Sequence, residues 1–120
     1  MIKRHADAIG HALDGLVWAF RTQHNYKTHF FLIAISIVAG VFLKLNATEW
    51  IAILITALLG IIIETVNTSI EQMGDAIDLN YNEHVKISKD VSASAMLLYA
   101  IGALGVAIMI FGPKLFILIF

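Results

Sequence analysis

Two carboxylates and an amide interrupt an apolar stretch of the chain, at Glu64, Glu71 and Asn67 in the segment IIIETVNTSIE. Residues 50–63, immediately before Glu64, contain no charged side chain. The spacing places these three side chains, together with Thr68, on one face of a helix. A carboxylate in hydrocarbon costs at least about 2.5–3.5 kcal/mol on insertion scales, so we expect this cluster to have a function.

The side chains of this cluster suit phosphate and metal chemistry. Mg²⁺ is commonly held by one or two carboxylates together with substrate phosphates, and a lysine supplies positive charge to a phosphate. Lys89 and Asp90 open the next apolar segment at about the same expected depth. A half-buried carboxylate such as Glu64 can accept the proton of a lipid hydroxyl. Together these roles describe phosphoryl transfer from ATP to a membrane alcohol.

Two other interpretations of the cluster stay open on the residues alone. In the first, Glu64 pairs with Lys89 and Asn67 joins neighbouring helices, so that the cluster is a structural clamp. In the second, the carboxylates mark a proton or cation pathway, as ionisable residues inside membranes often do. The sequence contains neither a GxxxxGK[ST] loop nor the protein-kinase signatures, so a nucleotide site here would not be a standard one.

The composition is that of an integral membrane protein. Of the 120 residues, 59% are apolar and 14% are charged, whereas soluble domains carry about 25% charged residues. The net charge of −1 gives no basis for nucleic-acid binding, and the absence of cysteine excludes disulfides and cysteine-ligated metals. Residues 1–120 are expected to form a single domain with most of its mass in lipid.

The apolar segments predict an all-α membrane protein. Residues 1–28 combine apolar positions at helical spacing with a polar opposite face, which predicts an amphipathic helix in the membrane interface. Residues 29–45, 49–71 and 90–112 are apolar enough for three transmembrane helices, since roughly 20 residues cross a bilayer. Thr48 is a candidate N-cap, residues 75–90 form a polar connector, and Pro113 is expected to end the third span.

The basic residues indicate the orientation. By the positive-inside rule, the N-terminus and the 71–90 connector face the cytoplasm. Fifteen residues separate Glu49 from Glu64, which is about 22 Å along a helix in a hydrocarbon core about 30 Å thick. Glu64 is therefore expected within the membrane, near its cytoplasmic face. The residues that support this orientation are Lys3, Arg4, Arg21, Lys27, Lys86 and Lys89, against Lys44 and Lys114 on the opposite side.

The same residues resemble a known family. IIIETVNTSIEQMGDAID followed by KISKDVSASAM is similar to the small bacterial membrane lipid kinases, which comprise diacylglycerol kinases and undecaprenol kinases. Their pattern is E-x-x-N-[ST]-x-[IL]-E, a short connector with an aspartate, and then K-D followed by small residues. FRTQHNYKTH before the first span and PKL near the end resemble the undecaprenol branch, so the resemblance covers nearly the whole chain.

The resemblance implies a fold, an assembly and an activity. It implies an N-terminal surface helix, three transmembrane helices and a homotrimer in the cell's cytoplasmic membrane, with sites shared between subunits. It implies ATP as co-substrate, Mg²⁺ as cofactor and a lipid alcohol as acceptor. Glu64 would be the catalytic base, Glu71 would contact metal and nucleotide, and Asn67 would belong to the active site.

Further site residues follow from the same resemblance. Gln23 stands where many members carry a metal-binding glutamate, and it offers a carbonyl oxygen but no charge. Asp75 matches the connector aspartate of the family, and Thr68 shares the helical face of Glu64. The remaining nucleotide contacts are expected at Arg4, Asn80, Tyr81, Asn82, Lys89 and Asp90.

The natural lipid is the point on which the two branches differ. Diacylglycerol brings two ester carbonyls that need hydrogen-bond donors, whereas undecaprenol brings only hydrocarbon beside its hydroxyl. The stretch from Tyr26 to Leu43 offers few donors beyond Tyr26, Lys27, Thr28 and His29. A site that recognises polar groups of its substrate carries matching hydrogen-bond donors, and such a site rejects a substrate that lacks those groups. The few donors here therefore favour undecaprenol as the substrate, with diacylglycerol accepted more slowly.

Overall fold

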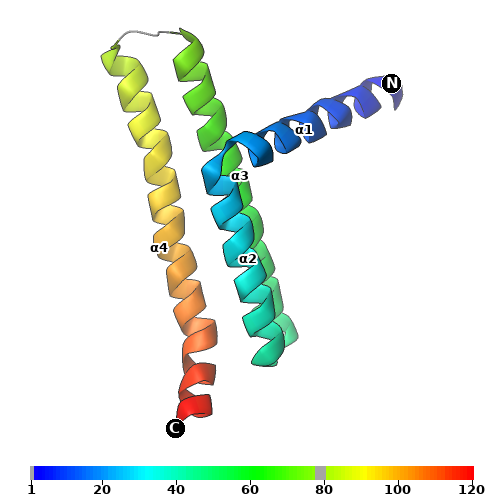
Figure 1. The fold of residues 1–120 in the computed structure, drawn as a ribbon, viewed down its shortest axis with the longest axis vertical. Helices are drawn as coiled ribbons and strands as arrows, with labels where there is room; N and C mark the ends of the chain where they lie inside the picture. The colour runs from blue at the N-terminus through cyan, green and yellow to red at the C-terminus, as the bar shows by residue number, and fades with distance from the viewer. Residues whose placement is uncertain (1, 78–80) are drawn as a thin grey trace.

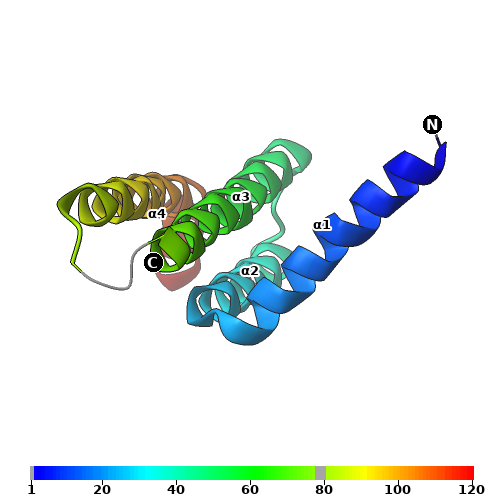
Figure 2. The ribbon, with the colours of Figure 1, turned by 90° about the horizontal axis from the view of Figure 1, so that it is seen from above.

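The computed structural model describes residues 2–77 and 81–120, and this part of the chain is helical. Its elements are α1 (Ile2–Thr22), α2 (His24–Phe42), α3 (Ala47–Ile77) and α4 (Glu83–Ile119). Helices α2, α3 and α4 are long and apolar enough to cross a membrane, which confirms the three expected spans. They run side by side, and α1 projects away from them (Figure 1). Seen from above, α3 lies between α4 and α2 (Figure 2).

The helix expected over residues 1–28 differs from the structure in its length. Helix α1 ends at Thr22, and Gln23 has an extended backbone with φ −92° and ψ 124°. Residues 24–28 instead form the first turns of α2. Packing explains this assignment, because Tyr26 is only 1% exposed and its hydroxyl lies 2.5 Å from the Thr65 hydroxyl on α3. The position of α1 at a membrane surface stays a prediction.

A tight turn joins α2 to α3. Lys44 has a left-handed backbone (φ 54°), and the amides of Leu45 and Lys44 donate to the carbonyls of Gly40 and Val41. This is the Schellman arrangement that ends many helices. Asn46 then caps α3 reciprocally: its side-chain oxygen accepts from the Glu49 amide at 3.0 Å, and the Glu49 carboxylate accepts from the Asn46 amide at 2.7 Å. The prediction of Thr48 as the N-cap is therefore wrong.

The second and third spans are longer than expected. Helix α3 continues to Ile77 and α4 begins at Glu83, so most of the predicted 75–90 connector is helical. The Asn82 side chain caps α4 by accepting from the amides of His84 and Val85. Pro113 lies inside α4 and does not end it, which contradicts the prediction. Proline removes one backbone donor, but apolar surroundings favour keeping every remaining backbone hydrogen bond inside the helix.

Candidate active site

The polar face of α3 is buried against its neighbours. Glu64, Asn67 and Thr68 are 2%, 4% and 5% exposed, and Glu71 is half-buried one turn further on. The expectation that these side chains share a face is thus confirmed. Carboxylates are rarely fully buried unless they are paired, so the low exposure of Glu64 requires a physical reason.

Asn67 is fixed in orientation by both of its side-chain ends. Its amide nitrogen donates to the Glu71 carboxylate at 2.9 Å, and its carbonyl oxygen accepts from the Ser92 hydroxyl at 2.7 Å. Ser92 belongs to α4, so Asn67 does join two helices, as the structural-clamp interpretation expected. The same bonds also hold the Glu71 carboxylate in place, which is a useful property for a metal or nucleotide ligand.

Glu64 is buried without full hydrogen bonding. Within residues 2–77 and 81–120, its Oε2 atom has no hydrogen-bond partner, and neither has the Thr68 hydroxyl. Asn25 and His29 from α2 and Glu71 from α3 lie near this carboxyl. Leaving a buried polar atom unpaired costs about 1–3 kcal/mol. An orphaned carboxylate oxygen beside a polar neighbour therefore indicates a place for a ligand.

Lys89 does not pair with Glu64, which contradicts one part of the clamp interpretation. Its ammonium instead forms an ion pair with Asp75 on α3. The lysine stem passes directly over Gly74, where an added Cβ would lie 2.8 Å from Lys89 Cε. An ion pair nearer to water loses less hydration than one at the depth of Glu64, and this difference favours Asp75 as the partner.

The other expected nucleotide residues are not gathered around Glu64 within one chain. Arg4 is exposed near the free end of α1, far along a helix that projects away from the spans (Figure 1). Tyr81 is 80% exposed, Asn82 caps α4, and Asp90 pairs with Lys86 on the helix surface. Asn80 lies outside the described residues.

The described residues contain no group of three or more histidine, aspartate or glutamate side chains placed to hold a metal ion. Mg²⁺ needs only one or two carboxylates when phosphates supply further oxygens, so Glu71 and Glu64 fit as donors by type. Seven residues separate them, about 10 Å along the axis. Gln23 is held to Thr22 at 3.4 Å and has no described bond to Glu71.

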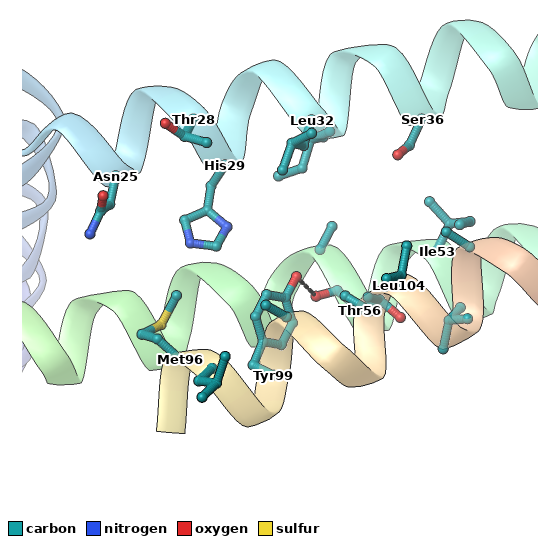
Figure 3. Close-up of a pocket in the computed structure, with 17 residues that line it drawn as sticks. Asn25, Thr28, His29, Leu32, Ser36, Ile53, Thr56, Met96, Tyr99 and Leu104 are labelled. Carbon is teal, nitrogen blue, oxygen red and sulfur yellow. Dashed lines mark hydrogen bonds between the residues drawn. The ribbon is translucent and has the colours of Figure 1, made fainter. Parts of the chain in front are cut away.

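A cavity of about 580 Å³ opens between α2, α3 and α4. Its polar lining includes Asn25, Thr28 and His29 at one end, and the remainder is mainly aliphatic (Figure 3). Asn25 and His29 both line the cavity and lie near Glu64, so the buried carboxyl is close to the polar end, although Glu64 itself does not line the cavity.

Sequence reasoning missed three residues of this region. Asn25 stands inside FRTQHNYKTH, where a polar residue entering a span is a usable signal. Ser92 stands in the run of small residues after Lys89 and Asp90, and such a run gives no signal of a hydrogen bond to Asn67. Tyr99, in the middle of the third span, carries no signal in the sequence, because its role depends on what faces it across the bundle.

Fold and site together define a class of protein: a three-span membrane protein whose buried acidic site adjoins an apolar cavity. The sequence model of the family described as "Prokaryotic diacylglycerol kinase" matches residues 10–111. The chain therefore belongs to the prokaryotic diacylglycerol kinase family, which confirms the resemblance drawn from its motifs.

Curated relatives agree with this assignment. The chain is 37% identical to a diacylglycerol kinase of Synechocystis sp. over 94 residues, covering 78% of this chain and 54% of that protein. It is 27% identical to an undecaprenol kinase of Bacillus subtilis over 114 residues, covering 95% and 93%. It is 28% identical to a diacylglycerol kinase of Helicobacter pylori over 96 residues, covering 80% and 75%. The chain thus spans about half of the Synechocystis protein.

Proposed function

We propose that this protein is an ATP- and Mg²⁺-dependent kinase that phosphorylates the hydroxyl of a membrane lipid alcohol. The observation that carries the proposal is the carboxylate of Glu64, 2% exposed and with an unpartnered Oε2, beside the polar end of a largely apolar cavity. A lipid chain in the cavity would bring its hydroxyl toward this oxygen. The family and the names of its relatives support the reaction class.

The transfer itself is a displacement at phosphorus. Glu64 accepts the proton of the lipid hydroxyl, the hydroxyl oxygen forms a bond to the γ-phosphorus, and the bond from that phosphorus to the bridging oxygen breaks to release ADP. General-base help of this kind is worth about 10²–10⁴-fold in rate. Thr68, one turn from Glu64 with its hydroxyl unpartnered, is placed to bind the same ligand.

The nucleotide would lie toward the water-exposed end of α3 and α4. Glu71, fixed by Asn67, would hold Mg²⁺ with an oxygen of Gln23, and the ion would neutralise phosphate charge. Lys89 would supply a point charge to a phosphate, with Asp75 holding its ammonium in place. The remaining contacts would come from Asp90, from Arg4, and from the segment around Asn80, Tyr81 and Asn82.

We infer a homotrimer, as the family resemblance implies, and the position of α1 supports a site shared between subunits. Within one chain α1 projects away from the spans (Figures 1 and 2), and Arg4 lies in its first turn. A neighbouring subunit would have to bring its own α1 to the site, with α1 lying along the membrane surface. This arrangement shares each site between two subunits and supplies contacts that a single chain leaves out.

The site would face the cytoplasm, where ATP is available. A cysteine at the exposed Tyr81 is expected to react with a membrane-impermeant thiol reagent only in inside-out vesicles, and a cysteine at Asn46 only in right-side-out vesicles. Both variants start from a chain without native cysteine. The reversed labelling pattern would place the site away from ATP and defeat the kinase proposal.

Undecaprenol is the better acceptor in this account. Two hydroxyls of the cavity wall already donate to backbone carbonyls, Tyr99 to Thr56 at 2.9 Å and Thr56 to Ala52 at 2.8 Å. Few donors remain for the ester carbonyls of diacylglycerol. We expect a higher kcat/KM for undecaprenol in mixed micelles, and a clear preference for diacylglycerol would overturn this assignment while leaving the kinase proposal intact.

The proposal is tested by ADP release from purified protein in mixed micelles. We expect ADP release to require a lipid alcohol and to stop when divalent ions are chelated, with recovery on adding excess Mg²⁺. ADP release at the same rate without a lipid alcohol would show that the lipid is not the phosphate acceptor. Full activity in excess chelator would rule out the metal-assisted form of the transfer.

A further inference from the structure

Tyr99 crosses the middle of the cavity between α2, α3 and α4. Its hydroxyl donates to the Thr56 carbonyl at 2.9 Å, and its ring centroid lies 5.9 Å from that of His29. All three residues line the cavity. Figure 3 shows the phenol between Met96 and Leu104 along the cavity. The ring is therefore held at one end by its own helix and at the other by the backbone of α3.

Gly60 makes this position of the ring possible. An added Cβ at residue 60 would lie 2.6 Å from Tyr99 Cζ, closer than real Cβ atoms approach other atoms. Thr56 and Gly60 are one turn apart on α3, and the phenol lies against the helix between them. Because its hydroxyl is bonded to a part-buried carbonyl, swinging the ring aside would break that bond and leave a polar group unpaired.

The ring lies partway along the cavity, between two parts of different polarity (Figure 3). At one end the wall carries the polar groups Asn25, Thr28 and His29. Toward the other end the wall is mainly aliphatic, with Ser36 as a polar exception. This second part is lined by Ile33, Ile53, Ala103, Val106 and Ala107. A lipid whose hydroxyl reaches Glu64 and whose chain fills the aliphatic part must pass the edge of the Tyr99 ring.

We propose that Tyr99 is a specificity-determining residue, which favours lipids with one hydrocarbon chain beside the reacting hydroxyl over lipids with two. The inference rests on the proposed lipid kinase function. A ring fixed at both ends cannot yield to a second chain, whereas a single chain passes beside it. The substrate class that this geometry favours is a single-chain alcohol, such as a polyisoprenol or a monoacylglycerol.

The test compares two lipids that differ in the length of the second chain. Dioleoylglycerol and 1-oleoyl-2-acetylglycerol each have one free hydroxyl and two esters, so the ratio of their kcat/KM values isolates the second hydrocarbon chain. In mixed micelles the wild-type protein is expected to prefer 1-oleoyl-2-acetylglycerol. Tyr99→Ala should raise the ratio for dioleoylglycerol over 1-oleoyl-2-acetylglycerol by about tenfold, the scale on which pocket shape discriminates. The KM for Mg-ATP should stay unchanged, because Tyr99 lies away from Lys89.

Two further variants make the result specific to the ring. Leu98→Ala truncates the neighbouring residue of α4, which is 70% exposed and outside the cavity lining, and should leave the ratio unchanged. Tyr99→Phe keeps the ring and removes its bond to Thr56, so the ratio should rise less than in Tyr99→Ala. If Tyr99→Ala does not fold, Tyr99→Leu replaces it with the same expected direction.

The outcomes separate the two levels of the proposal. An unchanged lipid ratio in an active Tyr99→Ala or Tyr99→Leu variant overturns the role of Tyr99 and leaves the kinase function standing. An equal shift in Leu98→Ala also overturns it, because the effect would then belong to α4 as a whole. A wild-type protein that phosphorylates none of the lipids refutes the proposed function instead.

Discussion

Helices α3 and α4 carry carboxylates and lysines toward both of their ends, and the partners of these carboxylates differ. At the end near the α2–α3 turn, the Glu49 carboxylate accepts from the Asn46 amide and lies 3.1 Å from the Lys114 ammonium. Toward the other end Lys89 pairs with Asp75, whereas Glu64, near the middle of α3, keeps a buried oxygen without a partner among the described residues. A carboxylate whose bonds are all made within the chain stabilises the fold. One left unpaired and buried is available for a ligand.

The depth of the two carboxylates sharpens the difference. The side chain of Glu49 is 22% exposed and can remain hydrated in part, whereas the residue Glu64 is 2% exposed. The partly hydrated ion pair of Glu49 with Lys114 adds little to stability beyond the bond that Glu49 accepts from the Asn46 amide. A buried and unpaired group persists only where the surrounding structure holds it in place, as happens in active sites.

The largest effect is expected for Glu64→Gln. The amide is nearly isosteric but cannot take the hydroxyl proton, so turnover should fall by roughly 10²–10⁴-fold while Mg-ATP binding largely persists. Steady-state kcat and nucleotide binding are measured on the same preparation. Glu49→Gln is the matched control and should keep near-normal kcat. Near-normal turnover in Glu64→Gln at equal expression would remove this residue from the chemistry.

Glu71→Gln should weaken Mg-ATP binding by at least about tenfold, the usual scale for loss of a group that holds a metal site together. The KM for Mg-ATP and its dependence on free Mg²⁺ are the quantities to measure. Ser92→Ala removes the hydroxyl that donates to the Asn67 side-chain carbonyl oxygen but leaves the Glu71 carboxylate in place, so it should change the same constants less. An unchanged Mg²⁺ dependence in Glu71→Gln would assign the metal to other residues.

A smaller effect is expected for Gly74→Ala. The new methyl group would meet Lys89 Cε at 2.8 Å and Val85 Cγ1 at 3.1 Å, so the lysine must leave its place over α3. Displacing a packed contact costs about 1 kcal/mol or more, so the KM for Mg-ATP should rise about fivefold with kcat little changed. Gly105→Ala, where the added atom meets nothing within 4 Å, is the control. Equal kinetics in both variants would show that the position of Lys89 does not matter.

The smallest effect is expected for Lys114→Met. This change removes the partner of Glu49 but keeps the helix and its apolar stem, so the thermal midpoint should fall only slightly and the kinetic constants should not change. Differential scanning calorimetry of the detergent-solubilised protein gives the thermal midpoint, and steady-state kinetics give kcat and both KM values. A marked loss of activity would mean that the two ends are coupled, contrary to the comparison drawn here.

Local patterns in the sequence were enough for the spans and for the polar face of α3. Helical periodicity fixes which side chains of one helix are neighbours, and the face of Glu64, Asn67 and Glu71 follows from that alone. The ends of the helices were harder to predict from the sequence. Pro113 was expected to end the third span because soluble helices avoid internal proline, yet a helix in apolar surroundings continues past it.

Contacts between helices could not be predicted from the sequence. The predicted pairing of Glu64 with Lys89 assumed that residues at one depth meet, whereas the lysine stem follows the space over Gly74 to Asp75. Asn46 displaced Thr48 as the N-cap because the length of the turn decides which residue can reach the first amides. The cavity and the place of Tyr99 within it depend on three helices at once, so no single segment could reveal them.

The transfer of label from γ-labelled ATP into extracted lipid is the most direct measurement of the central claim. Purified wild-type protein in micelles containing undecaprenol and Mg²⁺ is expected to move the label into the organic phase as lipid monophosphate. Glu64→Gln should leave the label in the aqueous phase while still binding ATP, and Glu49→Gln should behave as the wild type. Label that stays aqueous with the wild-type protein, or that reaches the lipid equally well with Glu64→Gln, would contradict the account.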